Sequence, residues 1–149
     1  MQPTASWDAD RARDIIEAHL GMEGPALPIL HALQEEFGFV PEEVVPVIAD
    51  RLDVSRAEMH GVVTFYHDFR RRPAGRHVVK VCRAEACQAR GGRDVEAAFR
   101  RLLGLGWHET SADGRVTLEP VYCLGLCSTG PAALVDGEPI ARIDEARVA

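Results

Sequence analysis

The segment HVVKVCRAEAC, residues 77–87, decides the fold of the second half of the chain. Its first five residues are rich in β-branched side chains, which predicts a short β-strand ended by Cys82, with Cys87 in the loop that follows. A second segment, VTLEPVYCLGLCSTGP at 116–131, repeats this arrangement. It predicts a strand ended by Cys123, with Cys127 in the loop before a hairpin. Loops that leave the same end of a sheet can bring the two pairs of thiols together.

The rest of the second half completes a small α/β layer. Apolar residues recur at helical spacing over 93–103, after two glycines. Asp113-Gly114 is a turn signal, and Asp136-Gly137 stands between two short apolar runs, which predicts a hairpin. A short helix is expected over 144–149. This order favours a thioredoxin-like domain over residues 73–149.

The first half is helical in pattern. Helices are predicted over 8–20, 25–37, 41–52 and 55–66, since apolar residues recur every three or four positions. Ser55 and Glu58 have the spacing of a capping box at the start of the last helix. Short loops between helices imply an antiparallel bundle over residues 1–72. The fold class is therefore α+β, a helical bundle followed by a thioredoxin-like α/β domain.

Composition and charge narrow the classes of function. The chain is 46% hydrophobic and 27% charged, its net charge is −6, and that excess lies in the first 75 residues. An acidic helical half binds phosphate poorly, so a nucleic-acid partner is not expected. No apolar stretch is long enough for a membrane span. Residues 1–12 lack the basic start and apolar core of a secretory signal, so a cytoplasmic location is expected.

Four cysteines in a reducing compartment favour metal or redox chemistry. The spacing is Cys-x4-Cys, then 35 residues, then Cys-x3-Cys. Four thiolates are the ligand set of a [2Fe–2S] cluster. Structural zinc uses similar spacings, and two disulfides are a third reading, so spacing alone leaves all three open. Glycines flank both pairs, where they allow backbone amides to approach sulfur, and Arg83, Arg90 and Arg93 add positive charge nearby.

The two cysteine runs, together with HGVVTFY at 60–66, resemble the thioredoxin-like [2Fe–2S] ferredoxin family over residues 12–145. That family includes the 24-kDa subunit of respiratory complex I and the matching subunit of NAD-reducing hydrogenases. It also includes the gamma subunit of NAD-dependent, molybdenum-containing formate dehydrogenases. The resemblance implies one [2Fe–2S] cluster ligated by Cys82, Cys87, Cys123 and Cys127.

The resemblance also implies a partner subunit that carries FMN and an NAD(H) site. This sequence has no phosphate-cradling glycine motif, so the hydride chemistry is expected in the partner and no catalytic site is expected here. The residues CRAEACQA at 82–89 and the early C-terminus look most like the formate dehydrogenase subunit. The expected parent complex thus oxidises formate to CO2 with NAD+, through a molybdenum-containing catalytic subunit. A complex I or hydrogenase subunit, and a structural zinc domain for assembly, are the alternatives.

Overall fold

The computed structural model describes residues 7–148. The chain divides into two compact units, with the boundary between Pro73 and Ala74. Part of the N-terminal stretch considered for a signal, residues 1–6, lies outside the described residues. So does Ala149, the last residue of the expected C-terminal helix. None of the described helices is long and apolar enough to cross a membrane.

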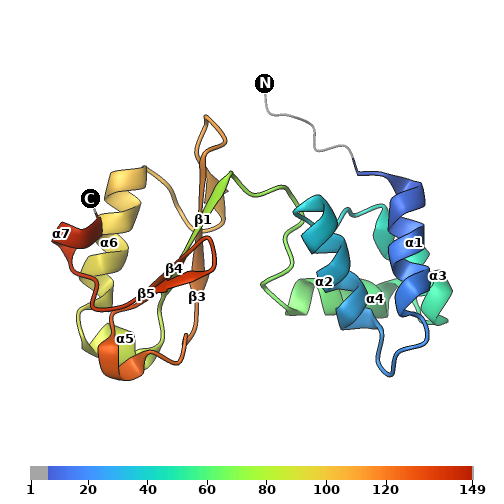
Figure 1. The fold of residues 1–149 in the computed structure, drawn as a ribbon, viewed down its shortest axis with the longest axis horizontal. Helices are drawn as coiled ribbons and strands as arrows, with labels where there is room; N and C mark the ends of the chain where they lie inside the picture. The colour runs from blue at the N-terminus through green and yellow to red at the C-terminus, as the bar shows by residue number, and fades with distance from the viewer. Residues whose placement is uncertain (1–6, 149) are drawn as a thin grey trace. The chain divides into compact units, whose positions relative to one another are not determined.

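The first unit is a bundle of four helices (Figure 1). They are α1 (Ala9–His19), α2 (Ala26–Phe37), α3 (Val44–Leu52) and α4 (Arg56–Phe65). Each helix contributes apolar side chains to one buried core, which includes Ile16, Leu33, Ile48 and Met59. Burial of these faces, more than helix propensity, stabilises helices of only nine to twelve residues.

The helix ends follow the local signals of the sequence. The Ser55 hydroxyl accepts from the Glu58 amide at 3.1 Å, and the Glu58 carboxylate accepts from the Ser55 amide at 2.8 Å. The predicted capping box is thus confirmed. The third helix begins at Val44 and not at position 41 as predicted. Pro46 consequently lies in the first turn, where its missing N–H removes no helical hydrogen bond.

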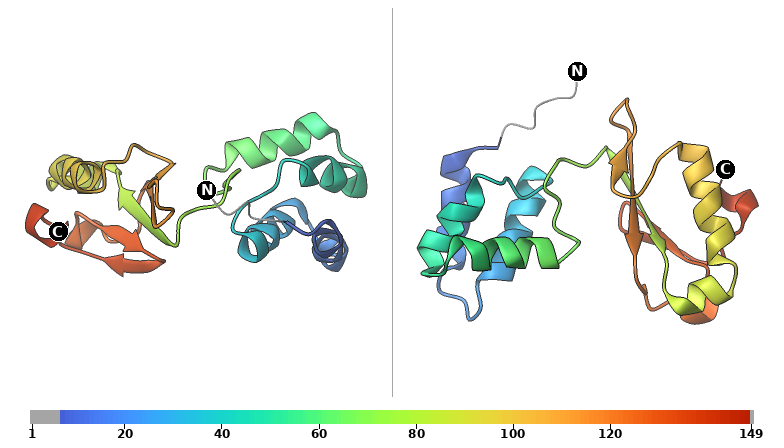
Figure 2. Two further views of the ribbon diagram at one scale, coloured as in Figure 1. Left: turned by 90° about the horizontal axis from the view of Figure 1, so that it is seen from above. Right: turned by 180° about the vertical axis from the view of Figure 1, so that it is seen from behind.

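The second unit is built on a mixed sheet in the order β2-β3-β1-β4-β5 (Figures 1 and 2). Its strands are β1 (His77–Cys82), β2 (Glu109–Thr110), β3 (Val116–Val121), β4 (Ala133–Val135) and β5 (Glu138–Ile140). Strands β1 and β3 are parallel, and the other neighbouring pairs are antiparallel. Asp136 and Gly137 both have positive φ between β4 and β5, which confirms the predicted hairpin.

Three helices complete this unit: α5 (Glu85–Ala89), α6 (Gly92–Leu103) and α7 (Glu145–Val148). Helices α6 and α7 lie on the same face of the sheet (Figure 2). Val95 and Phe99 of α6 pack there with Val79, Val81 and Leu118 of the central strands. The opposite face of α6 is charged, as expected for a helix that covers a sheet. Together the two units confirm the α+β class with a thioredoxin-like domain.

Candidate metal centre

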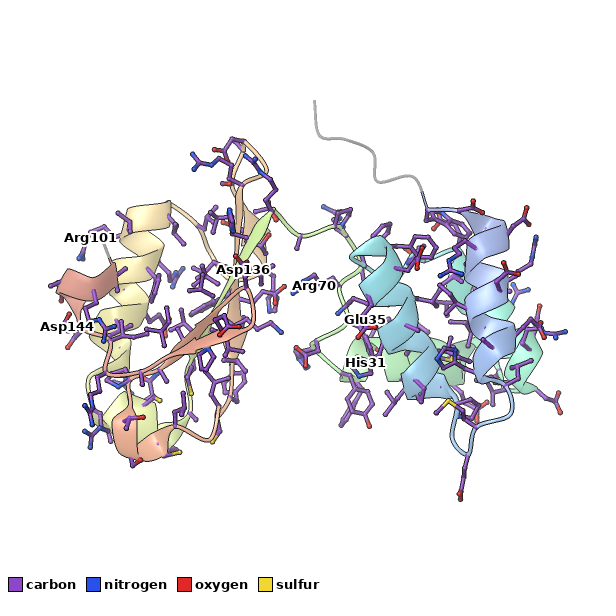
Figure 3. The ribbon with its side chains drawn as sticks, in the orientation of Figure 1. His31, Glu35, Arg70, Arg101, Asp136 and Asp144 are labelled. Carbon is purple, nitrogen blue, oxygen red and sulfur yellow. The ribbon has the colours of Figure 1, made fainter. Side chains whose placement is uncertain are left out.

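The sheet topology brings the two cysteine segments to one edge. Because β1 and β3 are parallel neighbours, their carboxyl ends lie at the same edge, with Cys82 opposite Val121. Strand β4 runs antiparallel to β1, so the segment before it returns to that edge. The Cys82 amide donates to the Ala132 carbonyl at 3.0 Å and the Arg83 amide donates to the Val121 carbonyl at 2.8 Å, and these two bonds join the three segments. In Figure 3 the sulfur atoms of this unit gather at the end of the sheet next to α5.

Cys82 ends β1 as predicted, but Cys87 lies in the five-residue helix α5 and not in a loop. A helix this short has no periodic pattern that a sequence can display. It turns the chain so that the Cys87 thiol points back toward Cys82. The junction between α5 and α6 is tight: a Cβ atom on Gly92 would lie 2.6 Å from the Cys87 carbonyl oxygen. Glycine is therefore required where α6 begins.

The second pair also departs from the prediction. Cys123 follows the end of β3 by two residues, and its φ of 74° is in the left-handed region. Non-glycine residues adopt this conformation at a cost, and such outliers gather at functional sites. Cys127 opens a 3-10 helix, Cys127–Thr129, instead of standing in an irregular loop. Gly125 between them also has a φ of 74°, so the chain turns back sharply enough to pair the two thiols.

The Cys123 and Cys127 sulfur atoms are 3.7 Å apart. Thiolates that share one tetrahedral ion, with bonds of about 2.3 Å, have sulfur atoms about 3.8 Å apart. This pair therefore already has the separation that one tetrahedral ion requires. Cys82 and Cys87 form the other pair, in which each thiol shifts the pKa of the other.

The two pairs differ in burial. Cys82 and Cys87 are each 2% exposed, whereas Cys123 and Cys127 are exposed. Ala132 is buried beside the first pair, and the neighbouring side chains are apolar: Ala84, Val121, Leu124 and Leu126. The four thiols thus form a site with one pair in an apolar pocket and the other at the surface.

Backbone amides point at the buried sulfur atoms. The amides of Ala84, Cys123 and Leu124 lie near the Cys82 sulfur and favour its thiolate form. Burial opposes ionisation of this thiol, but the amides and the Cys87 thiol outweigh burial, so the pKa of Cys82 is lowered. Nothing in the sequence identified these amides, because they become donors to sulfur only when the ends of β1 and β3 meet.

The pKa values of Cys87 and Cys127 are raised in part by neighbouring cysteines. Burial, followed by the hydrogen bond with Cys82, raises the pKa of Cys87, although the Ala132 amide acts in the opposite direction. The hydrogen bond with Cys123, followed by its charge, raises the pKa of Cys127. Neighbouring thiolates therefore repel each other, and cations bound between them would offset this electrostatic repulsion.

Two further contacts hold the cysteine loops in place. A Cβ atom on Gly130 would lie 3.1 Å from the Cys87 sulfur, so the backbone approaches this thiol more closely than a side chain allows. The Arg90 Nε donates to the Gly130 carbonyl at 3.0 Å and ties the end of α5 to the loop that carries Cys127. Of the predicted basic residues, Arg83 pairs with Glu96 at 2.9 Å and Arg93 is exposed.

The arrangement suits a binuclear centre. All four cysteines are free thiols. A cluster with two irons needs four thiolates as two pairs, with amides directed at sulfur to offset its negative charge. The donor set, the pairing and the amides therefore fit a [2Fe–2S] cluster.

Comparison with known proteins identifies the family. The family model for thioredoxin-like [2Fe–2S] ferredoxins matches residues 12–149. The chain belongs to this family, whose members carry a [2Fe–2S] cluster. This confirms the resemblance seen in the sequence.

Individual relatives agree with the family match. The chain is 37% identical to a subunit of the NADH-quinone oxidoreductase of Pseudomonas aeruginosa over 113 residues, which are 76% of this chain and 68% of that protein. It is 34% identical to the NADP-reducing hydrogenase subunit HndA of Solidesulfovibrio fructosivorans over 125 residues, 84% of this chain and 72% of that protein. The fold also matches the crystal structure of an NAD+-reducing [NiFe]-hydrogenase, with a TM-score of 0.64 at 23% identity. That match covers 80% of this chain and 21% of the hydrogenase chain.

Proposed function

We propose that this protein is an electron-transfer subunit of an NADH-linked oxidoreductase and that Cys82, Cys87, Cys123 and Cys127 ligate its [2Fe–2S] cluster. The observation that carries the proposal is the convergence of two thiol pairs at one edge of the sheet, with the exposed pair 3.7 Å apart. The thiols would hold the cluster as two pairs, Cys82 with Cys87 and Cys123 with Cys127.

The chain's own residues prepare this site for a charged group. The bound cluster would supply a one-electron carrier. The amides of Ala84 and Leu124 stabilise negative charge at the Cys82 sulfur. The apolar residues around Cys82 and Cys87 limit water at one pair, while Cys123 and Cys127 stay accessible at the other. The exposed pair would therefore leave one side of a bound cluster open to a partner.

The partner in this proposal is a subunit that binds FMN and NAD(H). Its support is the set of relatives, which are subunits of an NADH-quinone oxidoreductase and of an NADP-reducing hydrogenase. These names favour a complex I or hydrogenase parent at least as well as the formate dehydrogenase indicated by residues 82–89.

We also propose the cytoplasm as the compartment, because free cysteines persist where thiols are kept reduced.

Metal analysis of anaerobically purified protein tests the cofactor. We expect two irons and two acid-labile sulfides per chain, silent in EPR when oxidised and with a spin-half signal after dithionite. Zinc without iron, even after anaerobic reconstitution, would contradict the proposal and support a structural zinc domain.

Co-purification from the native host tests the parent complex. A tag on this chain is expected to recover an FMN-containing subunit together with its catalytic partners. A quinone-reducing assembly, a hydrogenase or a molybdenum-containing formate dehydrogenase are three distinct outcomes, separated by metal content and by the substrate that reduces the cluster.

A further inference from the structure

A shallow polar groove lies beside the thiol site on the second unit. It encloses about 550 Å³, and its lining includes Arg83, Gln88, Arg93, Glu96, Arg100 and Tyr122. Most of these residues come from α5 and α6, and the thiol site does not use them as ligands. The groove therefore adjoins the thiol site without including any of the four cysteines.

The groove is continuous with the thiol site. Arg83 directly follows Cys82 in the chain, and Tyr122 directly precedes Cys123. The Arg83 guanidinium lies 3.5 Å from the Tyr122 hydroxyl, and Tyr122 is 65% exposed. A molecule seated in the groove would consequently lie next to the exposed pair of cysteines.

The lining carries excess positive charge. Three arginines face one carboxylate, and Glu96 is contacted by Arg83 at 2.9 Å and by Arg100 at 3.9 Å. Within the part of the chain that the structure describes, Arg93 is exposed and its side chain forms no ion pair or hydrogen bond. The guanidinium of Arg93 is thus available to a group outside this chain.

Two of the arginines are held in position before anything binds. The Arg83 and Arg100 guanidinium groups lie over the Trp107 ring, 5.1 and 6.0 Å from its centre. Stacking on an aromatic face and contact with Glu96 restrict both side chains. Because less side-chain entropy is lost on binding, such preorganised cations favour association.

We infer that this groove is the docking surface for an acidic segment of the protein that exchanges electrons with this chain, an inference that rests on the proposed function. Arginine and tyrosine are enriched where protein partners bind, and complementary charge accelerates encounter. The groove is open and polar, unlike the apolar enclosed pockets that hold small molecules. Seating the partner here brings it to the exposed cysteines, where electron transfer needs close approach.

The test compares charge reversals on one helix. Arg93→Glu places a carboxylate in the groove, and Arg100→Glu is the second groove variant. Arg101→Glu is the matched control: Arg101 is on α6 but toward α7 (Figure 3), where it pairs with Glu145 at 3.6 Å and not with the groove. Each variant is prepared as the holo-chain, and its iron and sulfide contents are measured first.

The measurement is the association rate constant of the holo-chain with the purified FMN subunit, over a range of ionic strengths. We expect Arg93→Glu to lower this rate about tenfold at low salt and to flatten its salt dependence, with Arg100→Glu acting in the same direction. Arg101→Glu is expected to remain within about twofold of wild type. Iron content should be unchanged throughout, which separates docking from cluster binding.

Several results would overturn the inference. Equal association of wild type and Arg93→Glu, or an equal loss in Arg101→Glu, would remove the groove as a docking surface while leaving the proposed function intact. Saturable binding of inorganic phosphate that Arg93→Glu abolishes, with subunit association unchanged, would make the groove a small-anion site. Wild-type protein without iron, or without association to any FMN subunit, would instead be a failure of the proposed function, and the docking inference would fall with it.

Discussion

The two cysteine pairs are held by different means. Cys82 and Cys87 are buried, one at the end of a central strand and one on a short helix, and three amides reach the Cys82 sulfur. Cys123 and Cys127 are exposed, and two residues with positive φ place them. The first pair is thus positioned by the core of the unit and the second by local backbone conformation.

This difference separates two tasks that one site must perform. A pair fixed in an apolar pocket limits water and sets the geometry of the centre. A pair at the surface leaves only a short distance for an electron to cross to a partner protein. Variants that affect one pair without the other can test this division. The largest loss of iron is expected when a cysteine ligand itself is replaced.

Replacement of one cysteine in each pair should have unequal effects. We expect Cys82→Ser to leave less than about a tenth of the wild-type iron, since a buried serine oxygen cannot adjust its position to replace sulfur. Cys127→Ser should retain a larger fraction after anaerobic reconstitution, because the exposed segment can move. Iron and sulfide analysis with EPR measures both variants. Unchanged iron in Cys82→Ser would contradict the ligand assignment, and equal losses would contradict the proposed division between the pairs.

Thiol labelling of the cluster-free protein compares the same pairs without substitution. Cys123 and Cys127 should react with iodoacetamide about ten times faster, or more, than Cys82 and Cys87, because labelling a buried thiol requires local opening. Mass spectrometry of peptides at successive times gives the four rates. Unfolding in guanidinium is the control, and it should make the rates similar. Similar rates in the native protein would show that the buried pair opens freely.

Gly130→Ala tests the close approach of backbone to the buried pair. The added methyl would lie 3.1 Å from the Cys87 sulfur, so we expect a loss of about 1–3 kcal/mol in the free energy of unfolding and an altered EPR signal. Gly104→Ala is a control without a steric conflict, since nothing lies within 4 Å of its added Cβ, although its positive φ carries a backbone cost. An unchanged EPR signal in Gly130→Ala would mean that Cys87 adjusts without cost.

Asp136→Asn should produce the smallest effect, because Asp136 lies in the β4–β5 hairpin, at the end of β4 away from the cysteine edge. The Asp136 carboxylate accepts from the Val78 amide at 2.8 Å and from His77 at 2.7 Å. The His77 hydrogen bond and then the Val78 amide lower the pKa of Asp136. Its contribution to stability is therefore present above its unfolded pKa of about 3.9 and is lost as pH falls through the lower folded value.

We expect this variant to have a slightly lower melting temperature than wild type at neutral pH, with the difference closing in acid. Iron content should not change. Thermal melts at several pH values, with parallel iron analysis, measure both quantities. A loss of iron in Asp136→Asn would show that the cysteine edge is coupled to the hairpin. The positions of the two pairs would then depend on more than the core and the local backbone conformation.

Much of this molecule follows from local sequence. The β-branched run before Cys82, the capping box at Ser55 and the hairpin at Asp136-Gly137 were predictable because each depends on neighbouring residues. Strand β2 was missed because two residues carry no pattern, and it forms only by pairing with β3. The positive φ of Cys123 was also missed, because a cysteine gives no sequence signal for that conformation. The amides directed at Cys82 were missed because they depend on parallel pairing between distant segments.

The parallel register of β1 with β3 has a consequence for how this site can change during evolution. The two cysteine segments meet because β1 pairs with β3, whatever the length of chain between the two pairs. Insertions or deletions in the turn between β2 and β3 would lengthen or shorten the 35-residue interval without moving either pair. A search pattern for distant homologues should therefore keep the two short cysteine spacings strict and leave the long interval free.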